Sequence, residues 1–129
     1  MSEQNDDRQY TKGHVWAKID EETQQATIGL STYFIEQLPE ITSMDIPEEG
    51  DEIDVGAICM HFHIGNRILH LRSPLTGRVV EVNKEVLDNS SLIHLDPDVY
   101  WIFRMEFDNL DELDLLMDAR QYAEYIDEK

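Results

Sequence analysis

Short segments in which apolar and polar residues alternate place the strongest constraint on the fold of this chain. They recur between turn signals, over residues 14–19, 26–30, 41–46, 57–64, 67–72, 77–82 and 99–107. Alternation of this kind is typical of half-buried strands, and many short strands at this spacing favour a β-sandwich or a barrel. The chain has 129 residues, of which 41% are hydrophobic, so it can bury the core of one domain.

Two helical regions are expected beside the strands. Ser31 can cap a short internal helix that ends before Pro39. A C-terminal helical segment is expected over about residues 109–127, with a second helical stretch over residues 119–126. Its cap would be Asp108 or Asn109, and its apolar stripe would consist of Leu110, Leu113, Leu116 and Met117. Residues 1–8 lack periodicity and are expected to be a disordered N-terminal tail, which leaves residues 9–129 as the single domain.

The charge of the chain is strongly acidic but unevenly distributed. The formal net charge is -18, which argues against a nucleic-acid ligand because phosphate binding needs an excess of Lys and Arg. Residues 57–80 nevertheless contain no Asp or Glu, and they hold three arginines and three histidines. This window is either a basic element on an acidic body or ordinary solvated surface.

The location of the chain is inferred from what the sequence lacks. No apolar run reaches the roughly 18 residues of a membrane span, and no signal-peptide core follows Met1. A cytoplasmic location without membrane contact is therefore expected. The single cysteine, Cys59, cannot form an internal disulfide, which agrees with a reducing compartment, and inert packing is favoured over a reactive thiol.

Residues 59–72 form the most informative segment. Gly65-Asn66 has the composition of a two-residue hairpin turn, with glycine accepting the positive φ of a type II′ turn. The turn fixes a register that pairs the segment before it with the segment after it. The predicted pairs are Ile64 with Arg67, His63 with Ile68, Phe62 with Leu69, His61 with His70, and Cys59 with Arg72.

The same register sorts the side chains onto two faces. Met60, Phe62, Leu69 and Leu71 are predicted to face a core. The opposite face holds Cys59, His61, His63, Ile68, His70 and Arg72. His61, His63 and His70 could bring three imidazoles to one zinc ion, although the segment supplies no acid and exposed histidines on a sheet are usually polar surface.

Motifs along most of the chain resemble those of the glycine cleavage system H-protein family, the small lipoyl carriers of that complex. The resemblance runs from about Tyr10 to Ile126. It is carried by YTKGHVW at 10–16, ATIGLS at 26–31, EQL at 36–38, IPEEGDE at 46–52 and SPLTGRVVEVN at 73–83. The order and spacing of these pieces match those of the family.

The resemblance implies a fold, a cofactor and partners. The fold would be a mainly β barrel-sandwich hybrid, lipoyl-domain-like, with a short internal helix and C-terminal helices. In that family a lipoyl-lysine at the hairpin tip carries an aminomethyl group among decarboxylase, aminomethyltransferase and dihydrolipoyl dehydrogenase components. The partners would be proteins that recognise H-protein or lipoyl-type domains.

This chain departs from the family at the position of the lysine. Counting back from Pro74-Leu75-Thr76-Gly77 places the lipoyl-lysine on Asn66, whose side chain has no amine to form an amide with lipoate. The acidic residue used in lipoylation falls on His63, and Arg67 stands where a small residue is usual. The four lysines are Lys12, Lys18, Lys84 and Lys129, so none lies in the hairpin. No lipoyl cofactor is therefore expected, and zinc is an open alternative.

A second departure lies in the segment HLDPDVYW at residues 94–101. It is one residue shorter than the corresponding family segment and lacks the glycine before Trp101. In the family this loop neighbours the resting groove of the lipoyl arm, so the groove is also in question. Trp101, Phe103 and Met105 are expected to form a buried strand face.

Three functions follow from these observations. The first is a non-catalytic H-protein-like module that has lost its lipoylation site and acts through protein–protein interaction, with Gly65, Asn66 and Arg67 at the tip of the recognition hairpin. The second is an H protein that acts as carrier in glycine decarboxylation. The third is a metal-binding or regulatory protein that uses the histidine face. An enzyme is not expected, because no catalytic triad order, nucleophile elbow or phosphate-binding glycine loop is present.

Overall fold

The computed structural model describes residues 8–127, and it consists mainly of antiparallel strands. The strands are β1 Arg8–Tyr10, β2 Val15–Asp20, β3 Gln25–Leu30, β4 Ser43–Asp45, β5 Glu52–Ile53, β6 Ile58–Ile64, β7 Arg67–Arg72, β8 Gly77–Val82, β9 Phe103–Phe107 and β10 Met117–Asp118. The helices are α1 Thr32–Glu36, α2 Lys84–Asp88, α3 Ser91–Leu95 and α4 Ala119–Asp127, with a 3-10 helix over Leu110–Leu115.

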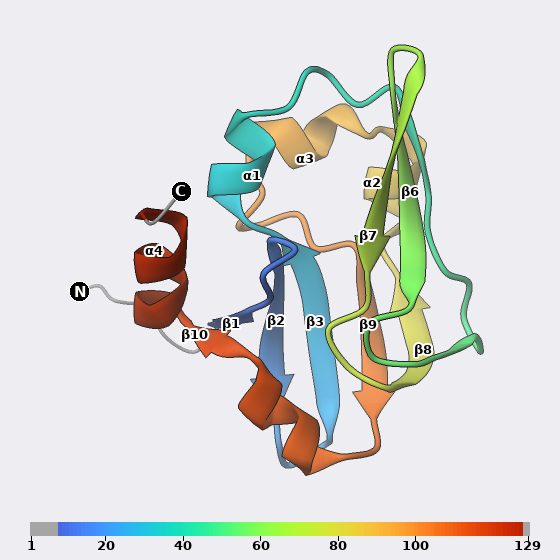
Figure 1. The fold of residues 1–129 in the computed structure, drawn as a ribbon. Helices are drawn as coiled ribbons and strands as arrows, with labels where there is room; N and C mark the ends of the chain where they lie inside the picture. The colour runs from blue at the N-terminus through green and yellow to red at the C-terminus, as the bar shows by residue number, and fades with distance from the viewer. Residues whose placement is uncertain (1–7, 128–129) are drawn as a thin grey trace.

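The strands form two sheets. The larger has seven strands in the order β10-β1-β2-β3-β9-β8-β5, and the smaller has three in the order β4-β6-β7. In Figure 1 the β6–β7 hairpin rises past the end of the larger sheet, while α1 and α3 lie beside its outer half. The hairpin is therefore rooted in the body but extends beyond it.

The core lies between the two sheets, as the alternation of each strand requires. The larger sheet contributes Val15, Ile28, Leu30, Phe103 and Met105, all fully buried, and the smaller sheet contributes Met60, Phe62 and Leu71. Phe103 and Met105 confirm the predicted buried face of that segment. Trp101 is half-buried and precedes β9, where the Arg104 guanidinium lies 4.3 Å above its ring.

A tryptophan and a glycine face each other on the far side of the larger sheet. Trp16 pairs with Gly29 across β2 and β3, and the indole is buried against the glycine backbone. A Cβ at residue 29 would collide with the indole ring. The Arg8 guanidinium lies 4.1 Å from the Trp16 ring centroid. Glycine at position 29 is therefore required by packing against Trp16, not by an unusual backbone angle.

Several predicted elements agree with the structure. Ser31 caps α1 by accepting a hydrogen bond from the Phe34 backbone N–H, as expected. The segments 67–72 and 77–82 have the predicted bounds of β7 and β8. Segment 99–107 begins its strand later, at Phe103, because the Tyr100 N–H donates to the Asp96 carbonyl in a turn. Helices α2 and α3 were not predicted.

The C-terminal segment over about residues 109–127 holds the two helical stretches that were predicted, but a short strand separates them. Asn109 does cap a helix, accepting from the Asp111 N–H, but that helix is 3-10 and ends at Leu115. Met117–Asp118 then forms the short strand β10, whose extended backbone pairs with β1. Helix α4 follows, as the second predicted stretch indicated. Pairing of distant segments, which a local helical pattern does not report, therefore decided this region.

Two expectations concern the ends of the chain and its location. Of the expected tail over residues 1–8, residues 1–7 lie outside the described residues, and Arg8 begins β1. Across residues 8–127, no helix is long and apolar enough to span a membrane.

Candidate functional site

The predicted hairpin is present with its predicted turn. Gly65 has a φ of +59°, while Asn66 is not among the positive-φ residues, which agrees with a type II′ turn. Gly65, Asn66 and Arg67 are all exposed. The turn lies at the end of the hairpin farthest from the larger sheet (Figure 1). The three tip residues are thus presented to solvent.

The register of the hairpin agrees with the prediction except at its root. The observed pairs include Ile64 with Arg67, His63 with Ile68, Phe62 with Leu69 and His61 with His70. A bulge between Ile58 and Met60 then shifts the ladder, so that Ile58, not Cys59, lies opposite Arg72. The predicted pair of Cys59 with Arg72 is wrong because the extra residue of a bulge is invisible to strict alternation.

The bulge places two chemically different groups at the hairpin root. Arg72 Nη1 donates to the Gly56 carbonyl at 2.7 Å, which ties β7 to the loop before β6. Cys59 is partly buried against the core. Burial raises the pKa of the Cys59 thiol to about 12, so the thiol is protonated at neutral pH.

The three histidines lie on the predicted face but do not meet at one point. His61 Nδ1 lies 2.8 Å from His70 Nδ1, and the two rings are nearly perpendicular. His63 instead contacts Asp45, with 3.0 Å between Nε2 and Oδ2. No group of three or more His, Cys, Asp or Glu side chains within residues 8–127 could hold a metal ion. The predicted metal set of His61, His63 and His70 is divided between two separate contacts.

Sequence reasoning missed Asp45 as the partner of His63. Strand β4 pairs with β6, so that Ser43 lies opposite His63 and Asp45 opposite His61. The alternation in segment 41–46 indicated a strand, since Met44 is buried between two exposed neighbours. Which strand it pairs with is a long-range property that the alternation does not encode.

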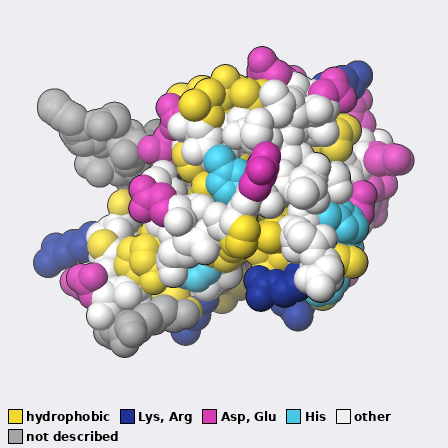
Figure 2. All heavy atoms as spheres, turned by 90° about the horizontal axis from the view of Figure 1, so that it is seen from above, with side chains coloured by type: hydrophobic (Ala, Val, Ile, Leu, Met, Phe, Trp, Pro, Cys, Tyr) yellow, Lys and Arg dark blue, Asp and Glu magenta, His cyan; other side chains and the backbone are white. Residues whose placement is uncertain are grey.

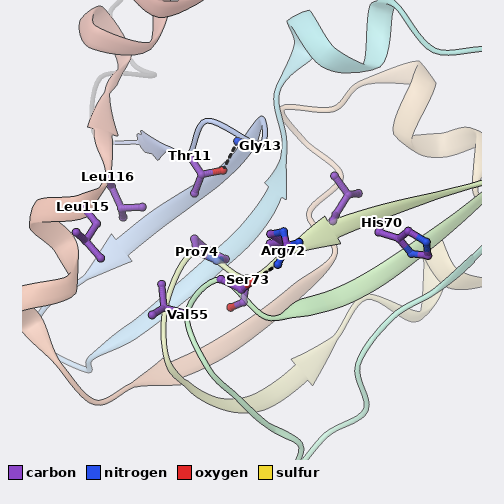
Figure 3. A pocket seen from close by; sticks show the side chains of 11 residues that line it. Thr11, Gly13, Val55, His70, Arg72, Ser73, Pro74, Leu115 and Leu116 are labelled. Carbon is purple, nitrogen blue, oxygen red and sulfur yellow. Dashed lines mark hydrogen bonds between the residues drawn. The ribbon is translucent and has the colours of Figure 1, made fainter.

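A pocket opens beside β7 near the root of the hairpin. Its volume is about 320 Å³. One wall is made by His70, Leu71 and Arg72 of β7, and the other by Thr11, Gly13 and the end of the 3-10 helix at Leu115 and Leu116. Figure 3 shows Leu115 and Leu116 on one side and Arg72 on the other, with Pro74 between them and Thr11 above it. The pocket is thus lined largely by apolar groups, with one arginine at its edge.

An aromatic cluster fixes α4 to the start of the chain. Tyr122 stacks on Tyr10 with ring centroids 4.4 Å apart. Its hydroxyl lies 2.7 Å from both Ser31 Oγ and His14 Nδ1. Burial raises the pKa of Tyr122. The cluster therefore ties α4 to β1 and to Ser31, the residue that caps α1.

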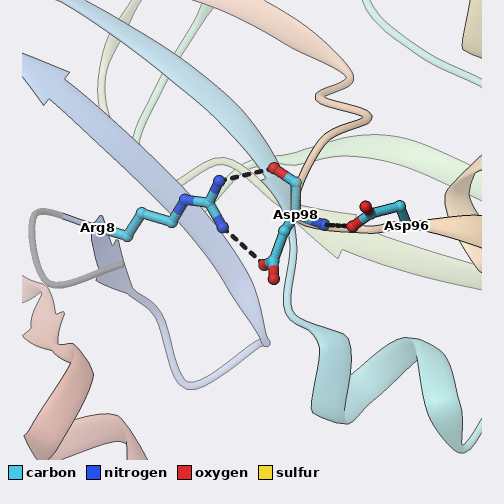
Figure 4. Close-up of polar contacts among 3 residues, drawn as sticks. All are labelled: Arg8, Asp96 and Asp98. Carbon is cyan, nitrogen blue, oxygen red and sulfur yellow. Dashed lines mark hydrogen bonds and ion pairs between the residues drawn. The ribbon is translucent and has the colours of Figure 1, made fainter. Parts of the chain in front are cut away.

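The segment at residues 94–101 is also held in place. Arg8 Nη1 forms an ion pair with Asp98 at 2.7 Å, and Arg8 Nη2 donates to the Asp98 carbonyl. The Asp98 N–H in turn donates to Asp96 Oδ1 (Figure 4). This loop is thus braced by β1, on the side of the larger sheet.

The exposed surface of the hairpin includes basic side chains. Figure 2 looks down on the end from which the hairpin rises. Lys or Arg side chains lie beside histidines at its lower right, and others lie at the left and upper right near carboxylates. On β7 the exposed side chains include Arg67, His70 and Arg72. The part of the sequence without carboxylates thus presents basic side chains to solvent.

Comparisons with known proteins agree on one family. The family model of the glycine cleavage H-protein matches residues 8–129. Glycine cleavage system H protein 4 of Aquifex aeolicus is 36% identical over 95% of this chain and 71% of its own length. The glycine cleavage system H protein of Thermotoga maritima is 33% identical over 92% of this chain and 94% of its own length.

A solved structure shows the same fold. The crystal structure of a glycine cleavage system H protein from Mycobacterium marinum matches with a TM-score of 0.82 and 24% identity. The match covers 95% of this chain and 98% of the solved one. It confirms the predicted mainly β fold with its helices, the barrel-sandwich hybrid of lipoyl domains. The chain belongs to the glycine cleavage H-protein family.

Proposed function

We propose that this member of the family is a non-catalytic module that has lost the lipoyl carrier chemistry and acts through protein–protein contact at the β6–β7 hairpin. Within this proposal residues 9–129 form one functional unit. The observation that carries the proposal is Asn66 at the exposed hairpin tip, where the family resemblance places the lipoyl-lysine. Its neighbours Gly65 and Arg67 also lack a side-chain amine of the lysine type.

The lipoyl group does not fit the residues at this tip. Attachment of lipoate needs an amine to form an amide, and an Asn carboxamide or an Arg guanidinium is not such a nucleophile. The described lysines lie elsewhere: Lys12 in the β1–β2 turn, Lys18 on β2 and Lys84 at the start of α2. In the resembled family an acidic side chain that serves lipoylation stands at the position of His63. Here that position is a histidine, which contacts Asp45. No step through a lipoyl arm is therefore assigned.

The charge and exposure of the hairpin support a binding role. Ile68 and His70 are exposed on one face of β7, Arg67 is exposed at its tip, and the face that carries Leu71 and Phe62 is buried in the core. Exposed charged and apolar residues that do not stabilise the fold are free to contribute contacts to a partner. A carrier in glycine decarboxylation, the alternative function, would instead need a modified lysine at the tip.

The test is transfer of lipoate in vitro. The purified chain is incubated with lipoate ligase, ATP and lipoate, and its intact mass is measured beside that of a lysine-bearing H protein. We expect the lysine-bearing protein to gain a lipoyl group and this chain to keep the mass of its sequence. A lipoyl addition to this chain would overturn the proposal and establish the carrier role.

A matched variant tests whether the tip is the cause. His63→Glu/Asn66→Lys restores the acidic residue and the amine at the two positions where the chain departs from the family. We expect this double variant to accept lipoate, while Asn66→Gln does not. If both variants stay unmodified, the assignment of the lysine position to Asn66 is wrong.

A further inference from the structure

The outer edge of β7 is an unpaired strand edge. Strand β7 is the last strand of the smaller sheet and pairs with β6 alone. Outside its ladder with β6, residues 67–72 make no backbone–backbone hydrogen bond with any other part of the chain that the structure describes. Such an edge presents a row of N–H and C=O groups that another strand can use.

The turn determines which backbone groups face outward. In a two-residue hairpin the residues that flank the turn form a hydrogen-bonded pair, and such pairs alternate with non-hydrogen-bonded ones. Ile64 and Arg67 flank this turn, so the pairs that follow, His63 with Ile68 and His61 with His70, are non-hydrogen-bonded. The N–H and C=O groups of Ile68 and His70 therefore point away from β6, toward the open side.

The pocket beside β7 lies on that open side. His70 and Arg72 line it, and Leu115 faces them from the opposite wall (Figure 3). A strand added to β7 would run about 4.8 Å from it, alongside the pocket wall that His70, Leu71 and Arg72 form. Successive side chains of an added strand point to opposite faces, so every second side chain of the segment would enter the pocket. Leu115 is 68% exposed and Val55 37% exposed, which leaves apolar surface for that set to cover.

The other set would face the polar side of the hairpin. His70 and Arg72 are exposed there, beside Ile68, which is 53% exposed, whereas Arg67 at the tip shares the other side of β7 with Leu69 and Leu71. Of the described residues that line the pocket, none carries a carboxylate. In a chain of net charge -18, this edge is a place where an acidic ligand meets positive rather than negative charge.

We propose that the outer edge of β7 binds an acidic, extended peptide segment of a partner protein as an added strand. Backbone hydrogen bonds to Ile68 and His70 hold the segment, alternate acidic side chains meet His70 and Arg72, and the intervening apolar side chains lie on the side of Leu71 and enter the pocket. This mode of recognition joins main-chain pairing to side-chain specificity. The inference deepens the proposed function, on which it rests, by naming the chemistry and the binding mode of the partner.

The test is titration of the full chain, labelled with ¹⁵N, with a capped heptapeptide of alternating Glu and Val. We expect shifts of the Ile68 and His70 amide signals and of residues that line the pocket, with a dissociation constant of about 1 mM or tighter. A heptapeptide of alternating Lys and Val is expected to bind at least about fivefold more weakly. No shifts at about 1 mM acidic peptide, or shifts confined to another surface, would overturn the proposal.

Two changes probe the backbone contact itself. Ile68→Pro removes an outward N–H that β6 does not use, and proline is tolerated at such edge positions, so we expect at least about tenfold weaker binding; Ile68→Val keeps the N–H and the affinity. An acidic peptide N-methylated at alternate amides tests the same hydrogen bonds without changing the protein. Equal binding by Ile68→Pro, or by both N-methylated registers, would refute strand addition.

The charge contact and the alternative occupant have separate readouts. Arg72→Gln is expected to weaken binding of the acidic peptide about two- to fivefold, whereas Arg120→Gln on α4 leaves the binding unchanged. Sedimentation of the free chain tests a second copy as occupant, and dimerisation through β7 that Ile68→Pro abolishes would replace the proposal. Lipoylation of the wild-type chain would defeat the proposed function without altering the peptide titration, so the two failures are distinguishable.

Discussion

The larger sheet and the β6–β7 hairpin are both antiparallel ladders, but they differ in how many of their faces are covered. In β2 and β3 the core face is buried, and the opposite face is covered where Trp16 lies on Gly29, although Lys18 farther along that face is exposed. In the hairpin, Met60 and Phe62 are buried while the other face carries exposed polar and basic groups. Substitutions at Trp16 and Gly29 must satisfy packing on two sides of the sheet, whereas substitutions at the exposed hairpin residues meet solvent.

The largest difference is expected between two glycines that differ in what surrounds them. Gly77 pairs with Phe107, and a Cβ there would lie against the backbone carbonyl of Glu106. Because that backbone belongs to the neighbouring strand, Gly77→Ala must push β8 and β9 apart. We expect a loss of about 3 kcal/mol or more in the free energy of unfolding, measured by urea denaturation. A loss below about 1 kcal/mol would show that the body is less tightly constrained than the comparison requires.

The next effect is expected at the aromatic cluster. Tyr122→Phe keeps the stacking on Tyr10 but removes the hydroxyl that contacts Ser31 and His14. Since Ser31 is buried, its hydroxyl loses a partner in a site that water does not reach. We expect a loss of about 1–3 kcal/mol, measured by the same denaturation. Unchanged stability would mean that these two hydrogen bonds are replaced on substitution.

A smaller loss is expected at the hairpin tip. Gly65 has a positive φ of 59°, but no atom lies within 4 Å of the position that a Cβ would take. Gly65→Ala therefore carries backbone strain without a collision, and we expect a loss of about 1 kcal/mol. Gly65→Ala and Gly77→Ala are the same chemical change. The ratio of their losses in the free energy of unfolding therefore measures how much more tightly the larger sheet is packed than the hairpin tip. Equal losses would contradict the comparison.

The smallest effect is expected in the pH dependence of the free energy of unfolding, through Cys59 at the hairpin root. The Cys59 thiol, with a pKa raised by burial from 9.0 to about 12, stays protonated in the folded chain while the unfolded chain loses its proton above about pH 9. The unfolded state then binds fewer protons, so stability falls as pH rises across this window. We expect Cys59→Ala to show a shallower fall than wild type between pH 9 and pH 12, measured by denaturation at several pH values.

Two tyrosines with raised pKa values provide an internal control for this pH series. Burial also raises the pKa of Tyr10 and Tyr122, and both tyrosines are present in either protein. Their ionisation lowers stability at high pH by the same amount in wild type and variant. Curves of identical slope would show that Cys59 is as accessible in the folded chain as in the unfolded one.

Local rules predicted the parts of the fold that neighbouring residues decide. The turn at Gly65-Asn66 fixed most of the hairpin register, and Ser31 fixed the start of α1, because each depends on contacts within a few residues. The Cys59 bulge, the strand Met117–Asp118 and the Asp45–His63 contact depend on pairing between distant segments. A single sequence carries no direct signal for such pairing, so these features could not be predicted.

The candidate site divides in the same way. The sequence predicted the exposed tip, the two faces of the hairpin and the pairing of His61 with His70. It did not predict the pocket, because the pocket joins β7 to Thr11 and Leu115, which lie far from β7 in the sequence. The shape of the site therefore depends on long-range pairing, including that of β10 with β1.

We propose that an H-protein scaffold here presents a hairpin that carries no lipoyl group. The most direct test is the intact mass of the endogenous protein, isolated from its own cells grown with lipoate. We expect the mass of the unmodified chain, with or without Met1. A species heavier by one lipoyl group, mapped by fragmentation to any residue of the chain, would contradict it.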